Sequence, residues 1–187
     1  MTALDHSSAL GDGVLALTSA SDIDFHNGDP ADDRRFLLTP AQRDWLVASG
    51  VPHPEAIVFP KQVHGDAIWR VTLKDEALRG YFEADAVVTD QIGLPVAIRT
   101  ADCLPLFLHD PLRHVIAAVH AGWKSTRLSI AAKTVETLTR DYGVNPSQLR
   151  AAIGPCIRWE SYEVGVDFRT FFPEDVRTVG GRLFLDF

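Results

Sequence analysis

Three residues that can bind a metal or act in nucleophilic catalysis stand at the ends of apolar runs in this sequence. His64 lies in "KQVHG", Cys103 in "TADCLP" and His120 in "VHAGW", and each is followed closely by a glycine or a proline. They are separated by 39 and 17 positions, far more than the paired spacing of a structural zinc finger. If they bind one ion, they must converge from different strands of a folded domain.

Two imidazoles and one thiolate form a ligand set that suits a catalytic zinc ion. Three protein ligands leave the fourth position of a tetrahedral zinc open for water or a substrate. Copper electron-transfer sites use the same ligand types, but they add a weak axial ligand that is often methionine. The only methionine of the chain is Met1, so the sequence favours Zn²⁺ over copper.

Two other interpretations of these residues stay open at this point. Cys103 as a thiolate and His120 as its general base would form a nucleophilic pair, because a nearby imidazole lowers the pKa of a thiol. Single histidines at strand ends and single buried cysteines are also common as structural residues that bind nothing. The pattern alone therefore allows a metal site, a Cys–His hydrolase or a purely structural role.

Short apolar segments predict the strands that would position these residues. They are rich in Val, Ile and Phe, and the breaks between them contain Gly, Pro or Asp. The predicted strands are 56–63, 67–72, 84–90, 94–100, 104–110, 114–120 and 148–155. Because open sheets usually bind ligands beyond the C-terminal ends of their strands, we expect the site there.

Two amphipathic helices accompany these strands. The first spans 39–50, with Thr39 as N-cap, Pro40 at the first helical position, and Trp45 and Leu46 facing the core. The second spans 125–143 and ends at a glycine. Its predicted buried face comprises Leu128, Ala131, Ala132, Val135, Leu138 and Tyr142. Strands interrupted by long helices predict a layered α/β (α+β) domain with a mixed sheet.

Composition bounds the class of protein. With 187 residues and 46% hydrophobic content, the chain predicts a single domain over 1–187, in which residues 1–35 are poorly patterned and 20–35 form a loop. A net charge of −7 argues against a nucleic-acid partner. No stretch has the pattern of an export signal or of a membrane span, and two separated cysteines fit a reducing compartment, so a cytoplasmic location is expected.

Five blocks of sequence closely resemble the laccase-domain family, and they occur in the order found in that family. The blocks are "KQVHGD" (61–66), "ADAVVTD" (84–90), "RTADCLPL" (99–106), "AAVHAGW" (117–123) and "AAIGPCI…YEVG" (151–165). They place a family-like core at about residues 56–168. By this resemblance His64, Cys103 and His120 correspond to the zinc ligands of the family, in a three-layer α/β/α sandwich.

The resemblance also implies an activity. Members of the family are known as polyphenol oxidases and as purine nucleoside phosphorylases that also deaminate adenosine. The implied partners are phosphate and a purine nucleoside, namely adenosine, inosine, guanosine or methylthioadenosine. Some bacterial members are linked instead to editing of peptidoglycan precursors. A zinc-binding or accessory module without turnover is a further alternative, whereas copper-dependent phenol oxidation is disfavoured because few histidines lie near the motifs.

Asp102, Cys103 and Arg99 are the predicted catalytic residues. Asp102 could shuttle protons beside the zinc ligands, or it could bond to backbone N–H groups and fix its turn. Arg99 could contact an anionic group, or it could pair with a nearby aspartate. Asp85 could orient a ligand histidine, or it could simply end a strand.

Gln62, Trp123 and Lys124 are the predicted substrate-binding residues. Gln62 could reach a ribose hydroxyl or a base edge, or it could be solvated. Trp123 could stack on a purine or anchor its helix by packing. Lys124 could bind phosphate as a point charge, since this chain has "HAGWKST" where the family usually has "HAGWRG".

Other departures from the family concern the two ends of the chain. Residues 17–24 lack the arginine of the family's N-terminal segment, and the sequence stops at Phe187, where members of the family continue. A shortened but active member, a core closed by association, for instance as a homodimer, and a loss of activity all remain open. Cys156 is expected in the interior, and surface positions are expected for His6, His26, His53, His109 and His114.

Overall fold

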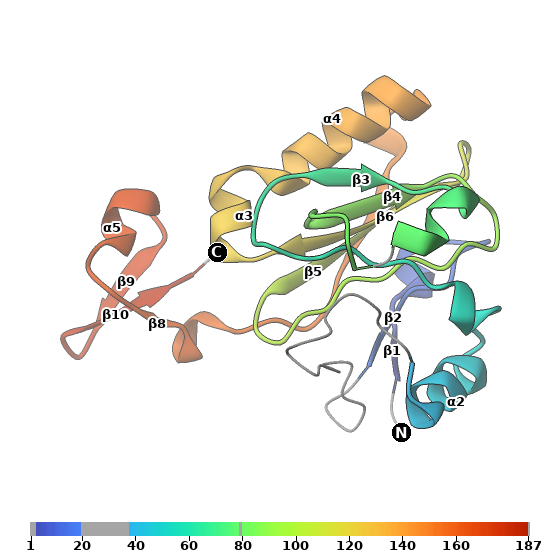
Figure 1. Ribbon diagram of the computed structural model, residues 1–187. Helices are drawn as coiled ribbons and strands as arrows, with labels where there is room; N and C mark the ends of the chain where they lie inside the picture. Colours follow the sequence, from blue (N-terminus) through green and yellow to red (C-terminus); the bar gives the residue numbers. More distant parts are fainter. Residues whose placement is uncertain (1–2, 20–37, 79, 187) are drawn as a thin grey trace.

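A mixed five-stranded sheet forms the centre of the computed structural model, which describes residues 3–19, 38–78 and 80–186 (Figure 1). The strands are β3 (Ile68–Arg70), β4 (Ala86–Thr89), β5 (Leu104–Asp110), β6 (Val115–Ala121) and β7 (Arg150–Ile153), in the order β3-β4-β6-β5-β7. The first two strands are parallel, and the other neighbours pair antiparallel. The predicted loop 20–35, with His26, lies outside the described residues.

Both faces of the sheet are covered. Helix α4 (Ile130–Tyr142) lies on one face, where Leu138 packs with buried residues of β4, β5 and β6. Helix α1 (Ser7–Leu10) and extended segments around Val58 and Leu94 lie on the other face. The prediction of a layered α/β fold with a mixed sheet is confirmed.

The helix predicted at 39–50 is confirmed as α2 (Pro40–Ala48). Thr39 and Gln42 form a reciprocal capping box, in which each side chain accepts a hydrogen bond from the other's backbone N–H. Trp45 and Leu46 are both 5% exposed. Gly50 follows the helix with φ = 85°, a conformation that glycine adopts without strain.

The helix predicted at 125–143 is two helices. α3 (Trp123–Arg127) and α4 are separated at Ser129, whose φ of 62° breaks the helical path. The predicted face is therefore wrong at Leu128, which is 44% exposed, and at Ala132, which is also exposed. The later part is correct, because Leu138 is fully buried and the helix ends at Gly143.

Two predicted strands, 56–63 and 94–100, do not form as such. They contribute only the isolated bridges Val58↔Val96 and Lys61↔Glu83. Both segments contain a proline, Pro60 or Pro95, which has no N–H to donate to a ladder. They still bury apolar side chains, since Val58 and Leu94 belong to the core beside β4.

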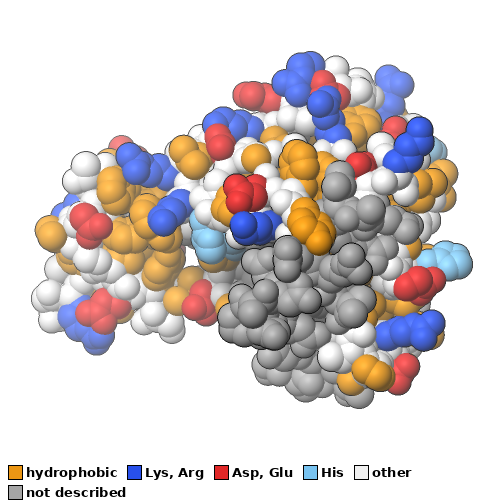
Figure 2. Space-filling view, in the orientation of Figure 1, with side chains coloured by type: hydrophobic (Ala, Val, Ile, Leu, Met, Phe, Trp, Pro, Cys, Tyr) orange, Lys and Arg blue, Asp and Glu red, His pale blue; other side chains and the backbone are white. Residues whose placement is uncertain are grey.

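The chain ends in a small unit, residues 159–186, called here the C-terminal unit. Its strands β8 (Glu163–Val164), β10 (Arg182–Leu185) and β9 (Val176–Val179) form an antiparallel sheet in that order, next to α5 (Phe168–Phe171). Figure 1 shows this unit beside the main body, near α3. Figure 2 shows hydrophobic side chains gathered on it and a hollow between it and the main body, with a histidine side chain at the edge.

The remaining described elements are short. β1 (Ala3–Asp5) and β2 (Leu17–Ser19) form an antiparallel pair. Single 3₁₀ turns or short 3₁₀ helices occupy Pro54–Ala56, Leu73–Leu78, Pro146–Gln148 and Trp159–Ser161. Among the helices of the described residues, none combines the length and the apolar character that crossing a bilayer requires.

Candidate metal centre

Antiparallel pairing of two buried strands brings Cys103 and His120 together. In the β5–β6 ladder Pro105 is opposite His120 and Leu104 is opposite Ala121. Cys103 directly precedes β5, so it lies at the same edge of the sheet as the end of β6. His120 lies near the C-terminal end of β6, as expected. The expectation is wrong for Cys103, which comes before β5 and reaches the site because the ladder is antiparallel, and for His64, which follows a segment that forms no strand.

The third residue of the cluster comes from a turn. His64 lies before β3 in a left-handed backbone conformation, with φ = 57°. Its ring meets that of His120 edge-on, with 4.8 Å between the ring centroids. Cys103 Sγ lies 3.9 Å from His64 Nε2. Three segments that are distant in the sequence therefore converge at one edge of the sheet.

The spacing of the three donors fits a single metal ion. One ligand atom from each of His64, Cys103 and His120 lies within 4.8 Å of the others. In a tetrahedral zinc site, sulfur and nitrogen ligands are about 3.6 Å apart, so donors within 4.8 Å of one another are near the separation that one shared ion requires. A thiolate with two imidazoles is also a chemically suitable set for a divalent transition metal. We conclude that these residues could hold a metal.

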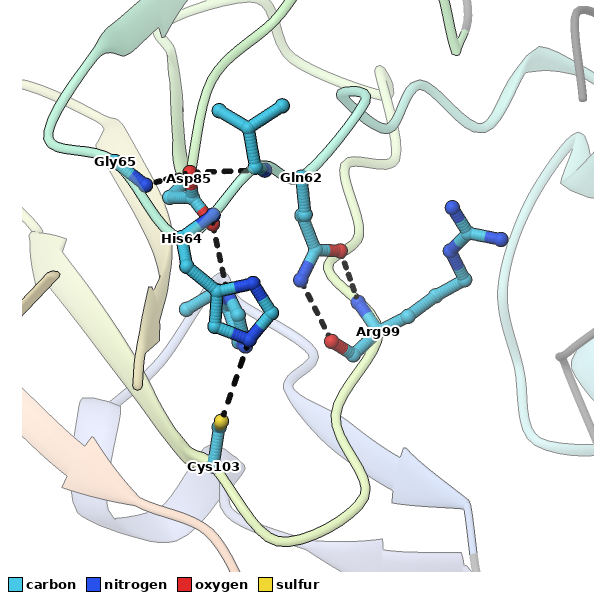
Figure 3. Close-up of polar contacts among 8 residues, drawn as sticks. Gln62, His64, Gly65, Asp85, Arg99 and Cys103 are labelled. Carbon is cyan, nitrogen blue, oxygen red and sulfur yellow. Dashed lines mark hydrogen bonds and ion pairs between the residues drawn. The ribbon is translucent and has the colours of Figure 1, made fainter. Parts of the chain in front are cut away.

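A buried carboxylate stands behind the cluster. Asp85 is 0% exposed and accepts a hydrogen bond of 2.7 Å from His120 Nδ1. Since Nδ1 is used in this way, Nε2 of His120 is the nitrogen left to face Cys103 and a metal. Asp85 also accepts from the backbone of the turn that carries His64 (Figure 3). The sequence leaves two roles open for Asp85, and this contact is the one expected if Asp85 orients a histidine.

The electrostatics of the two histidines differ. Burial by itself would lower the pKa of His120, but its hydrogen bonds to Asp85 and Cys103 outweigh burial and raise that pKa to about 9. Burial and then the charge of His120 lower the pKa of His64. For Asp85, burial opposes ionisation, but the hydrogen bonds from His120 and the turn hold its pKa below the ordinary value. In the metal-free cluster the neutral form is favoured at His64 and the protonated form at His120, so a metal bound by both would displace a proton from His120.

Gly122 lets the backbone pass close to the cluster. A Cβ at this position would lie 2.9 Å from His64 Cδ2 and 3.0 Å from Cys103 Sγ. Any side chain would therefore push two of the three candidate ligands aside. The sequence reasoning missed this residue, although its place directly after the histidine in "HAGW" was the available signal.

Comparison with known proteins gives a separate line of evidence. A profile of the family described as multi-copper polyphenol oxidoreductase laccase matches residues 19–184. The chain belongs to this family. Its members supply both the sequence relatives and the structural neighbours of the chain, so the resemblance stated from the five sequence blocks is confirmed.

Relatives in the laccase family carry a different name. A purine nucleoside phosphorylase of Deinococcus radiodurans is 45% identical over 111 residues, which cover 59% of this chain and 42% of the relative. A purine nucleoside phosphorylase of Aquifex aeolicus is 33% identical over 132 residues, which cover 71% of this chain and 60% of the relative. The chain spans about half the length of the curated relatives it matches.

Solved structures of the laccase family share the fold. The hypothetical protein YfiH of Bacillus licheniformis matches with a TM-score of 0.71 at 30% identity, over 78% of this chain and 60% of that one. YlmD of Geobacillus stearothermophilus matches with a TM-score of 0.69 at 28% identity, over 77% and 58%. The α/β architecture of this chain is therefore that of the laccase family.

Gln62 and Arg99 interact with each other in this member of the laccase family. The Gln62 amide donates to the Arg99 carbonyl and accepts from the Arg99 N–H, both at 2.7 Å. The Arg99 side chain extends away from the cluster, and its guanidinium carbon lies 5.6 Å from the centre of the Phe59 ring (Figure 3). This pairing ties the loop before Cys103 to the turn before His64. Roles for these two residues toward substrate remain predictions.

The other predicted substrate and catalytic residues lie around the cluster. Trp123 packs against Phe168 and Phe171 of the C-terminal unit, with centroid distances of 4.9 and 5.7 Å. Lys124 is exposed, with Nζ 5.5 Å from the centre of the Trp123 ring, and its charge contributes to the lowered pKa of His64. Asp102 is exposed, and its carbonyl accepts from Ile157 N–H at 2.8 Å. Their chemical roles also remain predictions.

A cleft opens beside the three candidate ligands. Polar and apolar groups from several segments line it, among them Gln62, Arg99, Asp102, Pro105 and Phe107. Tyr162 of the C-terminal unit is half-buried, and its burial, followed by the charges of Cys103 and Asp102, raises its pKa. This tyrosine begins the "YEVG" block, one of the blocks that carry the family resemblance.

One surface prediction is wrong. His109 is 3% exposed, and its Nδ1 donates a hydrogen bond of 2.9 Å to the Leu10 carbonyl. Its neighbours Asp110 and Pro111 suggested a loop, but residue 109 lies inside β5, where α1 covers it. His53 and His114 are exposed as predicted, while His6 and Cys156 are half-buried.

Proposed function

We propose that this chain is a zinc-dependent purine nucleoside enzyme. It would cleave the N-glycosidic bond of adenosine, inosine, guanosine or methylthioadenosine with phosphate, and it would also deaminate adenosine. The observation that carries the proposal is the convergence of His64, Cys103 and His120 on one point at the edge of a cleft. The purine nucleoside phosphorylases among its relatives support the substrate class.

The residues present suit zinc better than copper. Zn²⁺ is bound by two imidazoles and a thiolate in a tetrahedral site with one open position, whereas copper centres of this ligand type add an axial methionine. The sole methionine of the chain is Met1. A zinc ion held by these three residues would act as a Lewis acid toward an oxygen or nitrogen atom placed in the open position.

The chain itself would supply binding and proton transfer. Lys124 is exposed close to His64 and could hold one phosphate oxygen as a point charge. Asp102 is exposed on the loop that precedes β5, where a carboxylate could exchange a proton with the departing base or with solvent. The apolar wall around Phe107 would exclude water from one side of the bound nucleoside.

A direct assay tests this proposal. Purified protein, loaded with one zinc equivalent, is incubated with adenosine with and without phosphate, and the products are separated by chromatography. We expect inosine without phosphate, and adenine, ribose 1-phosphate and hypoxanthine only with phosphate, because the inosine formed is itself a substrate of the phosphate-dependent cleavage. Cys103→Ala should abolish every product, whereas Cys156→Ala, which alters the other free cysteine, should retain them. Product formation by Cys103→Ala equal to that of the unmodified chain would refute the zinc mechanism.

A second candidate is a metal-binding module without turnover. Two of the predicted substrate contacts are engaged within the chain, because the Gln62 amide bonds to the Arg99 backbone and Trp123 packs on the C-terminal unit. Absence of product together with stoichiometric zinc in elemental analysis would favour this candidate. Elemental analysis that finds several copper ions per chain would favour a polyphenol oxidase instead.

Location and assembly complete the proposal. We expect a cytoplasmic protein, since two cysteines that form no disulfide fit a reducing compartment. Small molecules are its expected partners, and a homodimer is the simplest assembly that could cover exposed apolar side chains. Light scattering in solution distinguishes a homodimer from a monomer.

A further inference from the structure

The two carboxylate oxygens of Asp85 accept four hydrogen bonds, one from His120, one from His64 and two from the residues on either side of His64. We propose that Asp85 is a positioning residue that sets His64 and His120 in the geometry needed for one metal ion. This inference rests on the metal-binding part of the proposed function. It adds a residue behind the ligands and a reason why that residue must be an aspartate.

The first half of the arrangement concerns His120. Its Nδ1 donates to Asp85 Oδ1 at 2.7 Å, and its backbone N–H donates to the Asp85 carbonyl, also at 2.7 Å. Asp85 therefore fixes both the ring and the backbone of His120, through its side chain and its carbonyl group. Because the ring can rotate only by breaking the Nδ1 bond, Nε2 stays directed at the cluster.

The second half concerns the turn that carries His64. Three consecutive backbone N–H groups, those of Val63, His64 and Gly65, donate to Asp85 at 3.2, 3.0 and 2.7 Å. His64 adopts φ = 57°, which is unfavourable for a residue with a side chain. An anion that collects successive N–H groups stabilises such a turn. Asp85 thus keeps His64 in a conformation that it would not adopt by itself.

The division of donors between the two oxygens shows why an amide cannot replace the carboxylate. Oδ1 accepts from His120 Nδ1 and His64 N, and Oδ2 accepts from Val63 N and Gly65 N. An asparagine has one oxygen and one NH₂ group at these places. In one orientation its NH₂ group faces His120 Nδ1 and the His64 N–H, and in the other it faces the N–H groups of Val63 and Gly65. Two donors therefore lose their acceptor in a fully buried site.

Asp110 provides a matched control. It is also buried, at 1% exposure, and its Oδ1 accepts from the backbone N–H groups of Leu112 and Arg113. It ends β5, whereas Cys103 precedes the same strand, so about 20 Å separates the two positions. Asp110→Asn therefore removes the charge of a buried carboxylate at the far end of β5 without touching the candidate ligands.

Cobalt(II) titration of the metal-free protein tests the inference. We expect Asp85→Asn to lower the cobalt affinity by about 10- to 100-fold, the usual range for a residue that orients a metal ligand, and to change the visible cobalt spectrum. Asp110→Asn should leave the cobalt affinity and the spectrum unchanged, even if it lowers the melting temperature as much as Asp85→Asn does. Equal cobalt affinity and an equal spectrum for Asp85→Asn and the unmodified chain would overturn the inference, as would an equal loss in Asp110→Asn.

A measurement on the unmodified chain covers the case in which Asp85→Asn does not fold. Long-range ¹H–¹⁵N spectra of the zinc-loaded protein should show His120 with its proton on Nδ1, and the opposite tautomer would overturn the inference. The nucleoside assay is independent of both readouts. Absence of product with an Asp85-dependent cobalt site would reject the enzyme and retain the positioning role, and the reverse outcome would reject only the positioning role.

Discussion

The central sheet and the sheet of the C-terminal unit differ in how deeply their strands are buried. In the central sheet, all four residues of β4 are buried, and so are six of the seven residues of β6. In the C-terminal unit, three of the four residues of β9 are exposed, and only one residue of β10 is buried. The candidate ligands lie at the edge of the well-packed sheet. A metal centre needs fixed donors, and the central sheet is the part that can fix them.

The C-terminal unit depends on its neighbours. A small antiparallel sheet with few buried residues has little stability by itself. Trp123 of α3 packs on Phe168 and Phe171, and the guanidinium carbon of Arg127 lies 4.2 Å from the centre of the Phe171 ring. These contacts join α5 to the helix that follows His120. We therefore expect changes in the two sheets to have separable effects.

The largest expected effect comes from a substitution that would create a cavity between α4 and the central sheet. Leu138 of α4 is fully buried against Val88, Leu108, Val115 and Ala117. Leu138→Ala should lower the free energy of unfolding by about 2–5 kcal/mol, measured by urea denaturation. Leu128→Ala, at a position that is 44% exposed, should change it by less than about 0.5 kcal/mol. Equal losses would contradict the break between α3 and α4.

A pH dependence is the next effect, and it also belongs to the central sheet. His120 has a folded pKa of about 9, above its ordinary value of 6.5, and Asp85, Cys103 and His64 face it. Below about pH 6.5, protonation of His120 contributes its full stabilisation to the metal-free protein, and this contribution is lost as the pH rises through 9. The expected decrease in the free energy of unfolding is on the order of 3 kcal/mol.

Denaturation of the metal-free protein at a series of pH values measures this effect. His120→Gln removes the titrating group and should flatten the curve between pH 6.5 and 9. A flat curve for the unmodified metal-free chain would show that His120 is not held by Asp85 as a cation.

The smallest expected effect concerns the C-terminal unit. Phe171→Ala removes the ring that stacks on Trp123 and lies under Arg127. We expect a loss of about 1–2 kcal/mol, since the ring is only half-buried. Hydrogen exchange should accelerate in β9 and β10 and stay unchanged in β4 and β6. Val179→Ala, at a half-exposed position of β9, is the control. Equal acceleration in β6 would show that the two sheets unfold together.

Local sequence signals predicted much of this fold. The capping residues of α2, the glycine that ends α4 and the apolar runs of β5 and β6 are all recognisable without a structure. Predictions were less accurate where packing overrode the local pattern. The segments around Val58 and Leu94 have the composition of strands, but prolines leave them as covering segments with single bridges. His109 was placed at the surface because no local pattern shows that α1 covers it.

By itself, the sequence determined which groups are available for chemistry: two imidazoles, a thiolate and a set of charged residues in blocks typical of one family. That these groups meet depends on how the strands pair and pack. Antiparallel pairing of β5 with β6 brings Cys103 to His120, and Asp85, at the start of the neighbouring strand, ties the turn of His64 to the same edge. These contacts join residues 17 to 35 positions apart, and such separations are set by the register and packing of strands, which no local pattern encodes.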